Sequence, residues 1–336
     1  MKKAQVVLVP SPGIGHLVPA IEFAKRLLDQ DDSFLITVLV IIKAPFGPDT
    51  DTCNQSMLTT IDTPIQYITL PKVTPPDLDP LTSPENYYTT FMEAHKPLVR
   101  DAVVNQVMSI KPAVPVVGLV VDLFCASMID VANELGISSY VYFASSAAFL
   151  GLLLYLPTRQ EQAGIEFKET DPDLIVSLFC QSCACQELES HAVRSFSGGG
   201  TPPVYTVGPL VNVNGHSLMG SNLDRHGKIL EWLDDQREKS VVFSVLRKYR
   251  AFEGSPGERN CTRAGTEWPQ ILMVHPMRSN NLVMADKIAK SVECVMEEDR
   301  EVRNRVKAMS EASRKAVMEG GSSFSAIGDL IKDMLS

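Results

Sequence analysis

The sequence has no long uninterrupted hydrophobic run and only a modest amount of positive charge. Its longest apolar tract, residues 140–156, contains Ser145 and Ser146 and is shorter than the ~20 residues of a membrane-spanning helix. The 31 basic residues are outnumbered by 40 acidic ones, and the net charge is -9. Nucleic-acid phosphates need a basic surface. We therefore expect neither an integral membrane segment nor a nucleic-acid partner.

Cysteine is also scarce, with seven residues in an irregular arrangement. An odd, irregular set does not indicate a disulfide framework and favours a reducing, cytoplasmic location. The tightest group is Cys180, Cys183 and Cys185, and no fourth ligand follows it at a regular spacing, so we predict no metal site. The apolar run after Lys2 and Lys3 ends at Pro10, too early for the core of a signal peptide.

The first half of the chain alternates between two kinds of apolar pattern. Short β-branched runs predict buried strands at residues 5–9, 34–42, 65–70, 116–121 and 139–143. Helical spacing predicts helices at residues 17–28, 86–110 (kinked by Pro97), 126–135 and 147–156. This alternation predicts an α/β, Rossmann-like domain with a parallel sheet. The loops at residues 10–16, 122–125 and 144–146 should then meet at the carboxyl ends of the strands, where ligands bind.

The second half is less regular. We predict a short helix at 229–235, a strand at 240–246 and a long helix within 285–319, whereas residues 247–266 show no periodicity. The 336 residues have room for about two domains. We expect an N-terminal Rossmann-like domain over residues 1–200, a linker over 201–222 and a truncated C-terminal domain over 223–336.

Several strings, taken in order, resemble the plant family of UDP-dependent glycosyltransferases that modify flavonoids and other phenols. They are VPSPGIGHLVP at residues 9–19, VVDLFC at 120–125, ELE at 187–189, VGPL at 207–210 and EGGSS at 319–323. The resemblance implies a GT-B fold of two Rossmann-like domains, a UDP-sugar donor with glucose as the expected sugar, a phenolic acceptor and a monomer. No metal or other cofactor is implied, since the UDP-sugar is a co-substrate.

The resemblance also assigns roles to individual residues. His16 matches the catalytic base and Asp122 its carboxylate partner; histidine suits proton abstraction near neutral pH, and a buried carboxylate orients such a base. From position alone, a histidine such as His16 is more often a residue at a helix start than a base, and the position of Asp122 is also that of a helix N-cap. Further candidates are Gly15, Ser145, Trp268, Gln270 and His275 for the donor, with Ser11 beside them, and Phe124, Phe143 and Phe149 for the acceptor.

The chain departs from the family pattern on the donor side. The family's donor box contains His-Cys-Gly-Trp, which is absent here, and only Trp268-Pro269-Gln270 with His275 resembles the start of that box. Ala144 stands where the family often has threonine. The chain resembles a member with two internal segments missing. This pattern leaves three interpretations: a glycosyltransferase with impaired activity, a non-catalytic fragment or pseudoenzyme that retains an acceptor-binding domain, and the product of a mis-spliced or degenerate gene.

Overall fold

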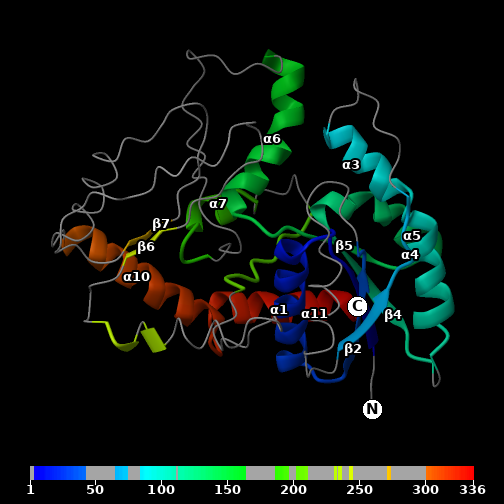
Figure 1. Cartoon of the computed structure of the whole chain (residues 1–336), viewed down its shortest axis with the longest axis horizontal. Helices are drawn as coiled ribbons and strands as arrows, with labels where there is room; N and C mark the ends of the chain where they lie inside the picture. Colours follow the sequence, from blue (N-terminus) through cyan, green and yellow to red (C-terminus); the bar gives the residue numbers. More distant parts are fainter. Residues whose placement is uncertain are drawn as a thin grey trace. The chain divides into compact units, whose positions relative to one another are not determined.

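The chain forms two compact units, one made of Met1–Ser221 with Met309–Ser336 and the other of Asn222–Ala308. Figure 1 shows the computed structural model. It describes residues 4–42, 65–74, 84–110, 113–163, 186–196, 202–210, 231–232, 234–236, 242–244, 271–273 and 300–336.

A five-stranded parallel sheet forms the centre of the first unit. Its strands are β1 (Ala4–Val9), β2 (Phe34–Val40), β3 (Ile65–Thr69), β4 (Val116–Asp122) and β5 (Ser139–Tyr142). All five lie where the sequence predicts them. The order β3-β2-β1-β4-β5 means that the chain leaves β1 in one direction and returns to β4 on its other side. The switch point between β1 and β4 is where such sheets bind ligands.

Both faces of the sheet are buried, which explains the nearly continuous apolar runs of the strands. In β1, Val6 and Leu8 belong to one apolar core and Val7 and Val9 to the other. The first core is closed by α1 (Ile14–Gln30) and α11 (Ser322–Met334), which lie together in Figure 1. Helices α3, α4 and α5 close the second core (Pro84–Glu93, Lys96–Ala102 and Ile129–Leu135).

Two of the predicted helices are subdivided. The segment predicted at 86–110 separates into α3, α4 and a π-helical stretch, Val103–Val107, and its main break lies just before Pro97. Proline has no N–H to donate and therefore interrupts a helix at this point. The segment predicted at 126–135 consists of a 3₁₀ turn, Leu123–Met128, followed by α5. Gly136 ends α5 in the left-handed conformation, with φ 67°, as a C-capping glycine does.

Further helices and strands complete the described structure. Helices α6 (Ala147–Ala163) and α7 (Ser190–Ser195) belong to the first unit. In the second unit, β6 (Val242–Ser244) pairs in parallel with β7 (Ile271–Met273). The predicted strand at 240–246 contains β6, whereas the sequence did not predict β7. Helix α10 (Arg300–Val317) lies within the long helical pattern, and the preceding residues 285–299 fall outside the described part. No helix of the described residues is both long and apolar enough to cross a membrane.

His95, in the turn between α3 and α4, should make the stability of the fold sensitive to acid. Its side chain is 2% exposed, and its Nδ1 lies 2.8 Å from the Phe91 carbonyl oxygen. Burial lowers the pKa of His95 from the ordinary 6.5. Below pH 6.5, His95 of the unfolded chain binds a proton that the buried His95 of the folded chain does not. The free energy of unfolding therefore falls as pH falls.

We therefore expect the melting temperature to drop between about pH 7 and about pH 5, and to drop less in His95→Gln. Circular dichroism during heating at several pH values measures this difference. His191→Gln, at an exposed position in α7, is the control and should keep the native slope. An unchanged pH slope in His95→Gln would contradict the assignment.

Candidate active site

The loop after β1 brings His16 toward the end of β4. Gly13 adopts φ 119°, a conformation that residues with a Cβ rarely adopt, and its carbonyl accepts hydrogen bonds from the N–H groups of His16 and Leu17, both at 3.1 Å. This sharp turn starts α1 and places His16 in the first helical turn. Asp122 is the last residue of β4. The two residues therefore meet at the switch point of the sheet.

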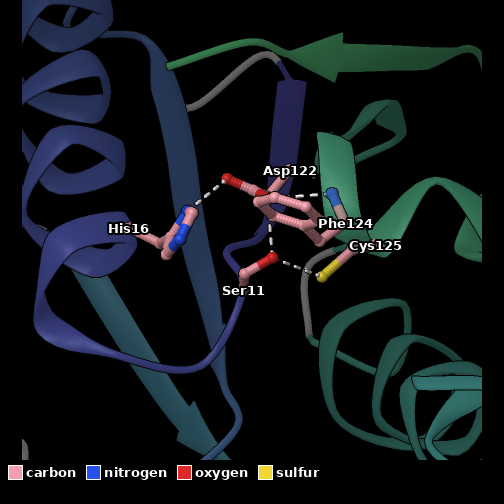
Figure 2. A network of polar contacts seen from close by, with 5 residues as sticks. All are labelled: Ser11, His16, Asp122, Phe124 and Cys125. Carbon is pink, nitrogen blue, oxygen red and sulfur yellow. Dashed lines mark hydrogen bonds and ion pairs between the residues drawn. The ribbon is translucent and has the colours of Figure 1, made fainter. Parts of the chain in front are cut away.

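His16 and Asp122 form a hydrogen-bonded pair, as Figure 2 shows. Nδ1 of His16 lies 3.0 Å from Oδ2 of Asp122. An ionised carboxylate only accepts hydrogen bonds, so in the neutral imidazole Nδ1 carries the hydrogen and Nε2 keeps its lone pair. The His16 side chain is 34% exposed, whereas that of Asp122 is 3% exposed. A buried carboxylate thus orients an imidazole that molecules in solution can reach.

Two further donors hold the other oxygen of the carboxylate. The Ser11 hydroxyl donates to Oδ1 of Asp122 at 2.6 Å, and the N–H of Phe124 donates to the same oxygen at 3.0 Å. Asp122 therefore caps the 3₁₀ turn Leu123–Met128, as its position in the sequence indicated, and it pairs with His16 at the same time.

Ser11 differs from its sequence assignment. The sequence predicts a contact of its hydroxyl with the donor, but the residue is 1% exposed and its hydroxyl is directed to Asp122. The same oxygen lies 3.5 Å from Sγ of Cys125. The position of Ser11 in the first loop was visible in the sequence, whereas its partner depended on how β1 and β4 align.

An exposed aromatic ring adjoins the pair. Phe124 is 55% exposed and makes edge-to-face contacts with His16 on one side and Tyr88 of α3 on the other, each with ring centroids 5.6 Å apart. Tyr88 was not singled out in the sequence, and no signal in α3 pointed to it. Phe143 and Phe149 form a separate stacked pair, with ring centroids 5.8 Å apart. The three predicted acceptor residues thus fall into two groups, and of these three only Phe124 is in ring contact with His16.

One thiol and two phenol groups near Asp122 keep their protons at physiological pH. Burial raises the pKa of Cys125 to about 12. Burial also raises the pKa of Tyr88, and it raises that of Tyr142 together with the nearby charge of Asp122. Within the described ranges, no group of three or more His, Cys, Asp or Glu side chains is arranged to hold a metal ion.

The donor-side candidates are only partly described. A Cβ placed on Gly15 would meet no atom of the described chain within 4 Å, so the space beside this residue is open. Ser145 is half-buried in the loop after β5, and its N–H donates to the Phe143 carbonyl at 2.9 Å. The remaining candidates, Trp268, Gln270 and His275, lie outside the described residues, as do Cys180, Cys183 and Cys185.

Comparison with known proteins identifies relatives of the chain in sequence and in fold. No protein-family model matches the chain. UDP-glycosyltransferase 71K2 of Pyrus communis is 29% identical over 479 aligned residues, which cover 100% of this chain and 98% of the relative. A putative UDP-glucose flavonoid 3-O-glucosyltransferase of Fragaria ananassa is 35% identical over 297 residues, covering 76% of this chain and 61% of the relative. The first alignment is much longer than the 336 residues of the chain, which therefore lacks internal positions that the relative has.

A solved structure extends the match to the fold. The crystal structure of Medicago truncatula UGT71G1 complexed with UDP-glucose matches with a TM-score of 0.78 and 26% identity, covering 99% of both chains. This likeness confirms the predicted α/β, GT-B-like fold. Sequence relatives and structural likeness together show that the chain belongs to the plant UDP-glycosyltransferase family.

Proposed function

We propose that the chain transfers glucose from UDP-glucose to a hydroxyl group of a flavonoid or a related plant phenol, with inversion at the anomeric carbon and with reduced efficiency. The observation that carries the proposal is the hydrogen bond between His16 and Asp122, which leaves Nε2 with a lone pair on a partly exposed ring. The relative of Fragaria ananassa is named for flavonoid glucosylation, and the Medicago truncatula structure contains UDP-glucose.

The reaction is a single displacement. Nε2 of His16 takes the proton of the acceptor hydroxyl while the acceptor oxygen forms a bond to the anomeric carbon. The bond between that carbon and the UDP oxygen breaks, and UDP leaves with the electron pair. Asp122 stabilises the imidazolium that forms, because its carboxylate is already bonded to Nδ1. The imidazolium then returns its proton to solvent.

The exposed face of Phe124 supports an aromatic acceptor. A planar phenol that packs against this ring lies beside His16, since the two rings are in edge-to-face contact. We assign Phe124 to the acceptor site on this ground. Phe143 and Phe149 form a second aromatic surface at the start of α6.

The donor side supports the reduced efficiency. The His-Cys-Gly-Trp sequence of the family's donor box is absent, and we assign the remaining donor contacts to Gly15, Ser145, Trp268, Gln270 and His275. Each lost charge-assisted hydrogen bond removes about 1.5–3 kcal/mol of binding free energy. The same observation favours a second function, a non-catalytic protein that binds phenols in the cytosol without transferring sugar.

Titration of the purified chain tests these functions. UDP-glucose and the flavonol quercetin are titrated separately by calorimetry, and the glucoside is then sought by mass spectrometry after both are mixed. Binding of both ligands with formation of a glucoside supports the transferase. Quercetin binding without UDP-glucose binding or product supports the non-catalytic function. Failure to bind either ligand, in a folded chain, contradicts both.

Ser11→Ala should lower the rate of glucose transfer about tenfold, because a hydrogen bond to the charged Asp122 is lost. The rate is measured at saturating quercetin. Ser127→Ala is the matched control, since Ser127 has a buried hydroxyl without a hydrogen-bond partner among the described residues. A native rate in Ser11→Ala would show that Phe124 N–H and His16 alone orient the carboxylate.

A further inference from the structure

The proposed function gives no role to the Glu187-Leu188-Glu189 string. In the structure, Glu189 connects two helices. Its backbone is the N-cap of α7, while its carboxylate lies at the start of α6, more than forty residues earlier in the chain. Oε2 of Glu189 accepts a hydrogen bond from the Ala147 N–H at 2.9 Å, and Oε1 accepts one from the Ala148 N–H at 3.3 Å.

With these two bonds, the first turn of α6 is fully satisfied. The first N–H groups of a helix have no partner within the helix. Here the Glu189 carboxylate accepts hydrogen bonds from the N–H groups of Ala147 and Ala148. The Ser146 hydroxyl accepts one from the Phe149 N–H at 3.1 Å. The fourth, of Leu150, donates to the Ser146 carbonyl at 3.1 Å. A negative charge at this end is also favourable to the helix dipole.

The turn that Glu189 holds carries residues assigned above to ligand binding. Phe149 belongs to it and stacks on Phe143, and Ser145 precedes it by two positions. We propose that Glu189 is a positioning residue for the acceptor site, because its carboxylate fixes the first turn of α6 and with it the Phe143–Phe149 pair. This proposal rests on the proposed function and deepens it.

The Glu189 carboxylate also keeps phosphate groups from binding at the N-terminus of α6. The N-terminus of a helix at the carboxyl edge of a parallel sheet commonly binds phosphate. At α6 the N–H groups of Ala147 and Ala148 already bond to Glu189, so this end has no free N–H group in its first two positions for the donor's diphosphate. The α6 turn therefore belongs to the acceptor side of the site.

Glu187 offers a matched control from the same string. Its Oε2 accepts a hydrogen bond of 2.6 Å from the Ser322 hydroxyl at the start of α11, and among the described residues it has no hydrogen bond to α6. Glu187→Ala and Glu189→Ala thus remove the same side chain from positions two residues apart, and only the second removes the cap of α6.

The experiment combines amide hydrogen exchange with quercetin titration on the full chain. In Glu189→Ala we expect the amides of Ala147 and Ala148 to exchange about tenfold faster and the Kd for quercetin to rise about tenfold. Glu189→Gln, which keeps one acceptor oxygen without the charge, should give about a threefold change in each. It also replaces Glu189→Ala if that variant does not fold. Glu187→Ala should leave both quantities at native values.

Unchanged exchange in Glu189→Ala and Glu189→Gln would overturn the proposal. So would faster exchange without weaker quercetin binding, because the cap would then be structural only, and so would equal effects in Glu187→Ala. The exchange readout needs neither sugar transfer nor acceptor. If the native chain binds no quercetin, while Glu189→Ala still loses amide protection, the result would contradict the proposed function and support the cap.

Discussion

Replacing His16 by alanine should lower the rate of glucose transfer about a thousandfold. Among the described groups that bond to Asp122, only the imidazole can take up the proton of the acceptor hydroxyl. The acceptor hydroxyl would have to lose its proton to water, while the ring of Phe124 would still bind the acceptor. We therefore expect the quercetin Kd to stay near its native value while the rate falls. Product formation at saturating quercetin and UDP-glucose measures the first quantity, and fluorescence titration the second.

His191→Ala is the control for this substitution. His191 is exposed on α7 and stands outside the pair, so its removal should leave the rate unchanged. A His16→Ala chain that transfers glucose at the native rate would exclude His16 as the base. A loss of quercetin binding in parallel with the rate would instead indicate that His16 contributes chiefly to acceptor affinity.

Asp122→Asn should cost about a thousandfold in rate as well, through the tautomer of His16. The Ser11 hydroxyl and the Phe124 N–H both donate to one oxygen position, so the amide oxygen must take that position. The amide NH₂ then faces Nδ1 of His16 and donates to it. The imidazole hydrogen moves to Nε2, and the lone pair that should accept the acceptor proton is lost.

Nitrogen NMR of the imidazole distinguishes this mechanism from a general loss of structure. The native chain should show hydrogen on Nδ1, and Asp122→Asn should show it on Nε2, with the melting temperature little changed because the bonds to Ser11 and Phe124 persist. Asp130→Asn is the control, since the Asp130 side chain is 72% exposed and bonds only to Lys96 among the contacts described. A native tautomer together with a native rate would refute the role of Asp122.

The strands and the central loops of the first unit could be predicted from sequence because both kinds of signal are local. The runs at β1, β2 and β4 are apolar throughout, as strands buried on both faces must be, and Gly13 marks the turn before α1. The sheet rule predicted that the loops of His16 and Asp122 meet, and the family resemblance predicted that the two residues pair, although they are 106 positions apart.

Other features depend on contacts that no local pattern reveals. Strand β7 has three residues, too few for an alternation to show, and exists through its pairing with β6. Phe124 and Phe149 looked equivalent in the sequence, yet one contacts His16 and the other stacks on Phe143. Ser11 and Glu189 act through partners more than forty residues away, so their roles became visible only with the coordinates.

The position of α11 on the first core has a consequence for how the chain is made. Gln30, at the end of α1, donates a hydrogen bond of 2.6 Å to the Phe324 carbonyl, 294 residues later. Ile327, Leu330 and Met334 fill the same apolar core as β1 and β2. During synthesis, the sheet can form long before these residues leave the ribosome, and its α1 side then lacks part of its cover. Until α11 arrives, the nascent chain exposes apolar surface that chaperones or proteases can recognise.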